Sequence, residues 1–147
     1  MAQFGRPSAD TNNPGSWVDQ ADGAVNIYLT IDEVVASDAD YVKSPSAPAT
    51  AVYVTKLSNL EDPVISTGHI LRTRYAKSAA GGAQINLVAE LRQAYVSEVS
   101  LGTLIATRTF TNISETFTTD AYTLAGAEAD AITNYTLLYL RLSANQV

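Results

Sequence analysis

The sequence predicts an all-β protein: a single antiparallel β-sandwich of jelly-roll type with about eight strands, an extended N-terminal arm and one short helix before the last strand. Three observations predict this fold. Apolar and polar residues alternate with a period of two in several short runs. Asp, Pro, Ser and Gly separate these runs at regular spacing. The chain is rich in Thr, whose β-branched side chain fits a pleated sheet. A fibronectin-like sandwich is the alternative architecture.

The length and composition indicate one domain. A chain of 147 residues can bury a core of its own. Charged residues make up 16% of the chain, which is low for a globular protein and suits a surface partly covered by protein neighbours. The absence of cysteine excludes disulfides, thiolate zinc sites and a cysteine nucleophile.

The charge balance argues against nucleic acid as a partner. The net charge is −6 and the isoelectric point lies near 4.5, whereas a nucleic-acid binder needs a basic footprint. No apolar run approaches the roughly 20 residues that span a membrane. The N-terminus has no hydrophobic signal core, so we expect synthesis in a cytoplasm and no membrane association.

The first element in the chain is a polar arm. Residues 1–16 contain Pro and Gly and too little apolar surface to fold alone. We therefore expect this arm to be held either by its own body or by another chain, with Phe4 and Trp17 as anchors. The predicted organisation is an N-terminal arm over residues 1–16 and a β-sandwich domain over residues 17–147.

The body then alternates strand and turn. In residues 25–33, Ile27, Leu29 and Ile31 share one face, which predicts the first strand. Residues 44–48 are predicted as a loop because two prolines disfavour helix and remove donors. Residues 59–68 form a connection and residues 79–82 a turn. The predicted strands are residues 25–33, 41–42, 51–57, 69–76, 85–91, 103–111, 115–124 and 135–142.

Three later elements need a further argument. Residues 85–91 contain good helix formers, but Ile85, Leu87, Ala89 and Leu91 alternate completely, which favours a strand. Residues 125–133 are Ala-rich and give the one predicted helix, of one or two turns. Residues 135–142 are apolar on both faces, as expected of a central strand that is covered on both sides.

No cluster of residues predicts catalysis. His69 is the only histidine, and no GxSxG elbow accompanies it, so a structural role is favoured over a catalytic triad. Glu90 and Glu98 lie in or beside strands, but nothing pairs them across a cleft as glycoside hydrolysis requires. Arg72 and Arg74 are expected on the solvent face of their strand. We predict no catalytic residue, no cofactor and no enzymatic activity.

Two binding possibilities stay open at this point. Asp32, Glu33, Asp38 and Asp40 offer oxygen ligands for Ca²⁺, although their spacing differs from an EF-hand and Asp commonly caps turns instead, so no metal site is assigned. Eight tyrosines and one tryptophan could form a sugar-stacking face, although packing in the core or at its rim is their usual role.

Several segments resemble the small jelly-roll β-sandwich structural proteins of tailed bacteriophage virions, of decoration or cement type. Such proteins are similar in architecture to jelly-roll carbohydrate-binding modules. The resemblance covers residues 17–143, outside the arm, and it supplies no functional residue. It is carried by DADYV at residues 38–42, LSNLEDP at residues 57–63, HILRTRY at residues 69–75 and NYTLLYLRL at residues 134–142.

The resemblance implies a non-enzymatic particle component. We expect a capsid decoration or cement protein on the exterior of a phage head, assembled in the host cytoplasm. It would bind major capsid proteins or other virion proteins as a homotrimer, with Phe4, Arg6 and Trp17 as partner-binding residues. The alternative is a tail, neck or fibre component of the virion, such as a carbohydrate-binding adhesion module. An enzyme such as a cell-wall hydrolase is the least favoured class.

Overall fold

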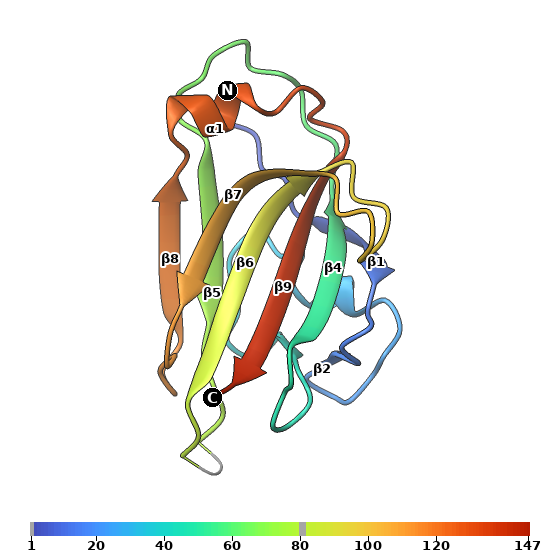
Figure 1. The fold of residues 1–147 in the computed structure, drawn as a ribbon, viewed down its shortest axis with the longest axis vertical. Helices are drawn as coiled ribbons and strands as arrows, with labels where there is room; N and C mark the ends of the chain where they lie inside the picture. The colour runs from blue at the N-terminus through green and yellow to red at the C-terminus, as the bar shows by residue number, and fades with distance from the viewer. Residues whose placement is uncertain (1, 80–81) are drawn as a thin grey trace.

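A computed structural model describes residues 2–79 and 82–147, and it confirms an all-β protein (Figure 1). Within these ranges the chain forms a five-stranded sheet, two small two-stranded sheets, one 3₁₀ helix and one α-helix. The turn predicted over residues 79–82 falls partly outside the described residues, because these omit residues 80 and 81. No helix in the described ranges is long and apolar enough to cross a bilayer.

The large sheet is antiparallel throughout, and the last strand of the chain lies at its centre. Because β9 pairs with β4 on one side and with β6 on the other, it receives backbone hydrogen bonds along both edges. The sheet order is β1 (Pro7–Asn12), β4 (Ala51–Leu57), β9 (Leu138–Gln146), β6 (Ile85–Gln93) and β7 (Thr103–Phe110).

A second layer is formed by β5 (Ile70–Tyr75) and β8 (Thr118–Thr123), which pair antiparallel. The layer is fastened to β7, because Tyr75 stacks on Phe110 with ring centroids 4.2 Å apart and Arg108 pairs with Asp120 at 2.8 Å. A third, minimal sheet joins β2 (Val18–Asp19) to β3 (Val42–Lys43). The arrangement is sandwich-like, and its jelly-roll topology stays a prediction.

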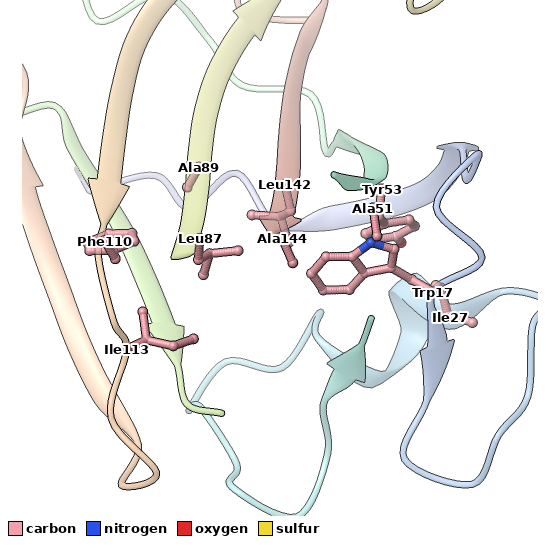
Figure 2. Close-up of a cluster of buried hydrophobic side chains, with 10 residues drawn as sticks. All are labelled: Trp17, Ile27, Ala51, Tyr53, Leu87, Ala89, Phe110, Ile113, Leu142 and Ala144. Carbon is pink, nitrogen blue, oxygen red and sulfur yellow. The ribbon is translucent and has the colours of Figure 1, made fainter. Parts of the chain in front are cut away.

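The core lies between these layers in two main clusters. Figure 2 shows the first cluster, with Phe110 and Ile113 at one end and Trp17 beside Tyr53 at the other. The second cluster contains Leu57, Leu71 and Leu91 among others and lies under α1 (Gly126–Asp130). Side chains from both layers contribute to each cluster, so burial of this apolar surface holds the layers together.

The prediction of a strand over residues 25–33 is wrong. These residues contain a short 3₁₀ helix, η1 (Ile27–Thr30), which follows Asn26 in the left-handed conformation with φ 55°. The Asp10 carboxylate accepts hydrogen bonds from the backbone N–H groups of Ile27 and Tyr28 at 2.9 and 3.0 Å, and this holds the first turn. Ile27 is buried, but Leu29, which the alternating pattern placed on the same face, is exposed.

Part of the predicted arm belongs to the body. Residues 7–12 form β1, which pairs with β4 at the edge of the large sheet. Gly15 donates its N–H to Val52 O at 2.8 Å, and a Cβ on Gly15 would lie only 2.2 Å from Val52 N, so only glycine fits this approach. The N-terminal segment is therefore held by its own chain.

The remaining strand predictions are confirmed with small shifts in their bounds. The segment with helix formers is the strand β6, and residues 51–57 are β4 as predicted. The predicted strand over residues 135–142 begins later, at Leu138, and runs to Gln146. The short helix before the last strand is present as α1, although it is shorter than the predicted residues 125–133.

Candidate binding surface

The three residues predicted to bind a partner lie in two different environments. Phe4 is 56% exposed, and the Arg6 guanidinium lies over its ring with the carbon 5.1 Å from the ring centroid. Trp17 is only 5% exposed and packs in the core with its ring centroid 6.2 Å from that of Tyr53 (Figure 2). Trp17 therefore fixes the N-terminal segment to its own body, while Phe4 presents aromatic surface to solvent.

Phe4 stands out among the aromatic side chains. In residues 2–79 and 82–147, every tyrosine, the tryptophan and the other two phenylalanines are buried or half-buried. Tyr53, Tyr95 and Tyr135 are among the most deeply buried. These tyrosines are therefore engaged in packing, the role that the sequence favours over a sugar-stacking face.

The backbone around Phe4 is fixed on both sides. Gln3 exchanges two hydrogen bonds with the backbone of Glu61, donating Nε2–H to its O at 3.0 Å and accepting its N–H on Oε1 at 2.8 Å. Ser58 donates its N–H to Arg6 O at 2.7 Å and accepts the Arg6 N–H on Oγ at 3.2 Å. Ordering Phe4 before binding reduces the conformational entropy lost when a partner covers it.

Two open pockets lie at the α1 end of the molecule, and Gln3 lines one of them. One has a volume of about 230 Å³ and the other about 570 Å³, and both are lined by Asp62 and Ile65. We call the surface that includes Phe4 and these pockets the end surface. It consists of Gln3, Phe4, Glu61, Asp62, Pro63, Val64, Ile65, Ser66, Ala129, Asp130, Ile132 and Tyr135.

The loop of the end surface is ordered by its own polar groups. Asp62 Oδ1 accepts the Val64 N–H at 2.7 Å, and the Ser66 hydroxyl donates a short hydrogen bond to Asp130 in α1. The Gln93 side-chain oxygen accepts the N–H groups of Thr133 and Asn134, which fastens the segment after α1 to β6. Elements distant in sequence thus combine into one surface of fixed shape.

The two pockets of the end surface are acidic. Glu61, Asp62 and Asp130 line the two pockets, and neither pocket has a Lys or Arg among its described lining residues. Burial raises the pKa of the Tyr135 hydroxyl, and the charges of Asp62 and Asp130 raise it further. The surface combines negative charge with exposed aliphatic side chains.

His69 lies close to this surface and pairs with Tyr135 rather than with the nearby Ser66. Its Nε2 lies 2.7 Å from the Tyr135 hydroxyl, whereas the Ser66 hydroxyl donates to Asp130. A Ser-His-Asp triad requires the histidine to contact the serine. His69 therefore pairs with Tyr135 and does not contact Ser66.

The acidic run at residues 32–40 is not gathered around one point. Asp38 is bound by Arg74 through two hydrogen bonds, at 2.5 and 2.6 Å, which hold the pKa of that carboxyl below its usual value. In the part of the chain that the structure describes, no three His, Asp or Glu side chains lie close enough to hold a metal ion.

Arg72 and Arg74 were predicted on the solvent face of their strand, and both are exposed on β5, which confirms this prediction.

Glu90 and Glu98 do lie near each other, but arginine separates them. Arg141 on β9 contacts Glu90 at 3.1 Å and Glu98 at 2.6 Å, and Arg92 contacts Glu90 at 2.9 Å. These arginines lower the pKa of both carboxyls, in Glu90 against a desolvation that would raise it. Two ionised and paired carboxylates cannot supply the proton donor of a glycosidase.

The sequence did not predict the loop at residues 61–65, which lines the pockets, as a binding element. Its signal is present in residues 61–65, where two acids, a proline and two aliphatic residues follow one another in a connection between strands. Aliphatic residues in such a loop have no sheet face to cover, so they remain exposed.

Comparison with protein-family models, curated proteins and solved structures finds no match to this chain.

Proposed function

We propose that this chain is a non-enzymatic virion structural protein, a decoration or cement protein that binds the outer surface of a phage head and stabilises contacts between major capsid proteins. The resemblance in residues 17–143 and the low content of charged residues support a particle component. The observation that carries the binding role is the exposed aromatic side chain of Phe4. Hydrogen bonds of Gln3 and Arg6 order the backbone on both sides of it.

The mechanism is binding alone. An aromatic side chain buries a large apolar area at a small cost in side-chain entropy, and residues of this kind dominate the energy of interfaces. A homotrimer would present the end surface three times, so that several modest contacts act together. Subunits of the head shell that are bridged in this way separate less readily.

The test is a substitution that removes the aromatic ring without touching the core. Phe4→Ala should weaken binding to purified heads about tenfold, because a well-placed aromatic anchor contributes more than 1 kcal/mol. The matched control is Val99→Ala, since Val99 is 98% exposed on the β6–β7 connection and lies outside the end surface. Binding is measured as occupancy of heads at limiting protein concentration.

The outcomes separate the alternatives. Loss of occupancy with Phe4→Ala but not with Val99→Ala supports the proposal. Equal occupancy of both variants overturns Phe4 as the anchor. A copy number that follows the symmetry of the tail or neck, rather than that of the head lattice, overturns the decoration role.

A further inference from the structure

We propose that the end surface recognises a basic segment of its protein partner, with a Lys or Arg side chain entering between Asp62 and Asp130 and an aliphatic neighbour covering Ile65. This inference deepens the proposed function and rests on it for the nature of the partner as a protein. It names the chemistry that the partner must present.

The first argument is charge complementarity. Asp62 and Asp130 line the smaller pocket, and Glu61 and Asp62 line the larger one, with no basic side chain in either described lining. A partner that carries acidic residues here would add like charges to this cluster, whereas a cation would reduce the repulsion. The surface therefore selects for a basic partner.

The second argument excludes a bare metal ion as the occupant. A metal ion needs several oxygen ligands converging on one point, and the described residues offer no group of three His, Asp or Glu side chains. One oxygen of Asp130 already accepts the Ser66 hydroxyl, and one oxygen of Asp62 accepts the Val64 N–H. The remaining carboxylate oxygens suit an ammonium or guanidinium, which donates to separate acceptors.

The third argument is the apolar surface beside the acids. Val64 is 88% exposed and Ile65 is 60% exposed, and the smaller pocket is also lined by Ala129 and Ile132. Lys and Arg carry a methylene stem below the charged head, so such a pocket can bury the stem while the acids bind the head. The aliphatic side chains and the acids of the pocket therefore match the methylene stem and the charged head of a Lys or Arg side chain.

The fourth argument is the length of the surface. Because Asp62 and Ile65 line both pockets, the two hollows adjoin, and Gln3 is part of the lining of the second. A partner segment of several residues can therefore contact both pockets. A single small cation would leave the second pocket and the exposed aliphatic side chains uncovered.

The experiment uses the full chain labelled with ¹⁵N and three synthetic pentapeptides that differ only at the centre: Leu-Leu-Lys-Leu-Ser, Leu-Leu-Glu-Leu-Ser and Leu-Leu-Gln-Leu-Ser. Backbone amide shifts are followed by NMR up to peptide concentrations on the order of several mM, which detects weak single-site binding. We expect the lysine peptide to shift amides at residues 61–66 and 129–135, and the glutamine peptide to shift them several-fold less.

Two matched variants test the acids. Asp62→Asn and Asp130→Asn should each weaken binding of the lysine peptide about two- to fivefold, the range for an exposed ion pair. Glu115→Gln removes an exposed charge outside the end surface and should leave binding unchanged. Each variant has the same net charge change, so a general electrostatic effect would appear equally in all three.

The outcomes are distinguishable from those of the proposed function. Equal shifts with the lysine and glutamine peptides, or equal weakening by Glu115→Gln, overturn the basic-segment inference whatever the particle test shows. Selective lysine binding together with unchanged head occupancy of Phe4→Ala supports this inference and overturns the aromatic anchor of the proposed function.

Discussion

At the scale of single residues, Asp10 has the widest structural effect. Its carboxylate accepts the N–H groups of Ile27 and Tyr28 and the hydroxyl of Tyr53 at 2.6 Å. Burial raises the pKa of the Tyr53 hydroxyl, and the hydrogen bond to Asp10 raises it further, so Tyr53 stays protonated and remains a donor. One side chain on β1 thereby joins η1 to the large sheet.

Removing this carboxylate should destabilise the fold. Asp10→Ala leaves three donors without their partner and should lower the free energy of unfolding by about 3 kcal/mol, whereas Tyr53→Phe removes one hydrogen bond and should lower it by about 1 kcal/mol. Urea unfolding measures both. Ser8→Ala, at an exposed position of the same strand, is the control. A loss below about 0.5 kcal/mol for Asp10→Ala, the size of an ordinary surface substitution, would contradict this role.

The same residue explains one failed prediction. Residues 25–33 alternate as a strand does, and local pattern alone predicts extended backbone. The outcome is decided instead by the left-handed Asn26 and by a carboxylate 17 positions away from Ile27 in the sequence. A window of neighbouring residues contains neither the position of Asp10 nor its hydrogen bonds.

At the scale of elements, the connection between β6 and β7 is fastened to the outer face of the large sheet by charge. Glu98 in this connection contacts Arg141 on β9 and accepts the Tyr95 hydroxyl at 2.8 Å, and Tyr95 in turn accepts a hydrogen bond from Asn12 on β1. Gly102 ends the connection with φ +66°, where a Cβ would lie 2.2 Å from Gln93 O. The network thus joins β1, β9 and this connection.

This network makes stability depend on pH at acid values. The Arg141 hydrogen bond lowers the pKa of Glu98 below its ordinary value of 4.5, so the stabilisation is complete above about 4.5 and is lost as the pH falls through the lowered pKa. We expect the thermal midpoint to fall between about pH 5 and pH 3, and Glu98→Gln to show a smaller fall from a lower starting value.

If the thermal midpoint falls equally in wild type and in Glu98→Gln, then Glu98 makes no contribution to the pH dependence of stability. Part of the fall should persist in the variant, because arginine neighbours also lower the pKa of Glu90, Asp38 and Asp120. Thermal unfolding followed by circular dichroism at several pH values provides the measurement.

β6 was predictable from its complete apolar alternation, whereas residues 25–33 alternate in the same way and form no strand, so alternation alone does not decide an element. β6 was identified because its alternating set outweighed its helix formers. β1 was missed because PSADTN contains no apolar alternation, and its pairing depends on tertiary contacts with β4. The end surface was missed for the same physical reason, since it joins residues 3–4, 61–66 and 129–135.

At the scale of the whole molecule, β1 lies inside the predicted arm, so we expect the folded body to begin before residue 17. Deleting residues 2–5 removes exposed chain and a few hydrogen bonds to the 58–61 segment, so the thermal midpoint should fall by only about 5 °C or less. Deleting residues 2–12 removes β1 with Asp10 and should abolish cooperative unfolding or lower the midpoint by more than about 15 °C.

Calorimetry on both deletions checks this boundary, and similar midpoints for the two would restore an arm that ends at residue 16. A deletion of residues 2–16 is for this reason a poor test of particle binding, because it damages the sheet together with the surface. The all-β class was predictable from periodicity, whereas the division between arm and body required the pairing of β1 with β4.

The two ends of the chain lie at opposite ends of the molecule (Figure 1). Val147 donates its N–H to Gln84 O, and Gln146 donates to Pro48 O, at the pole away from α1 and the end surface. A peptide or fluorescent protein fused after Val147 would therefore point outward when the end surface is occupied. On the proposed function, attachment at the end surface would leave cargo fused after Val147 at the opposite pole.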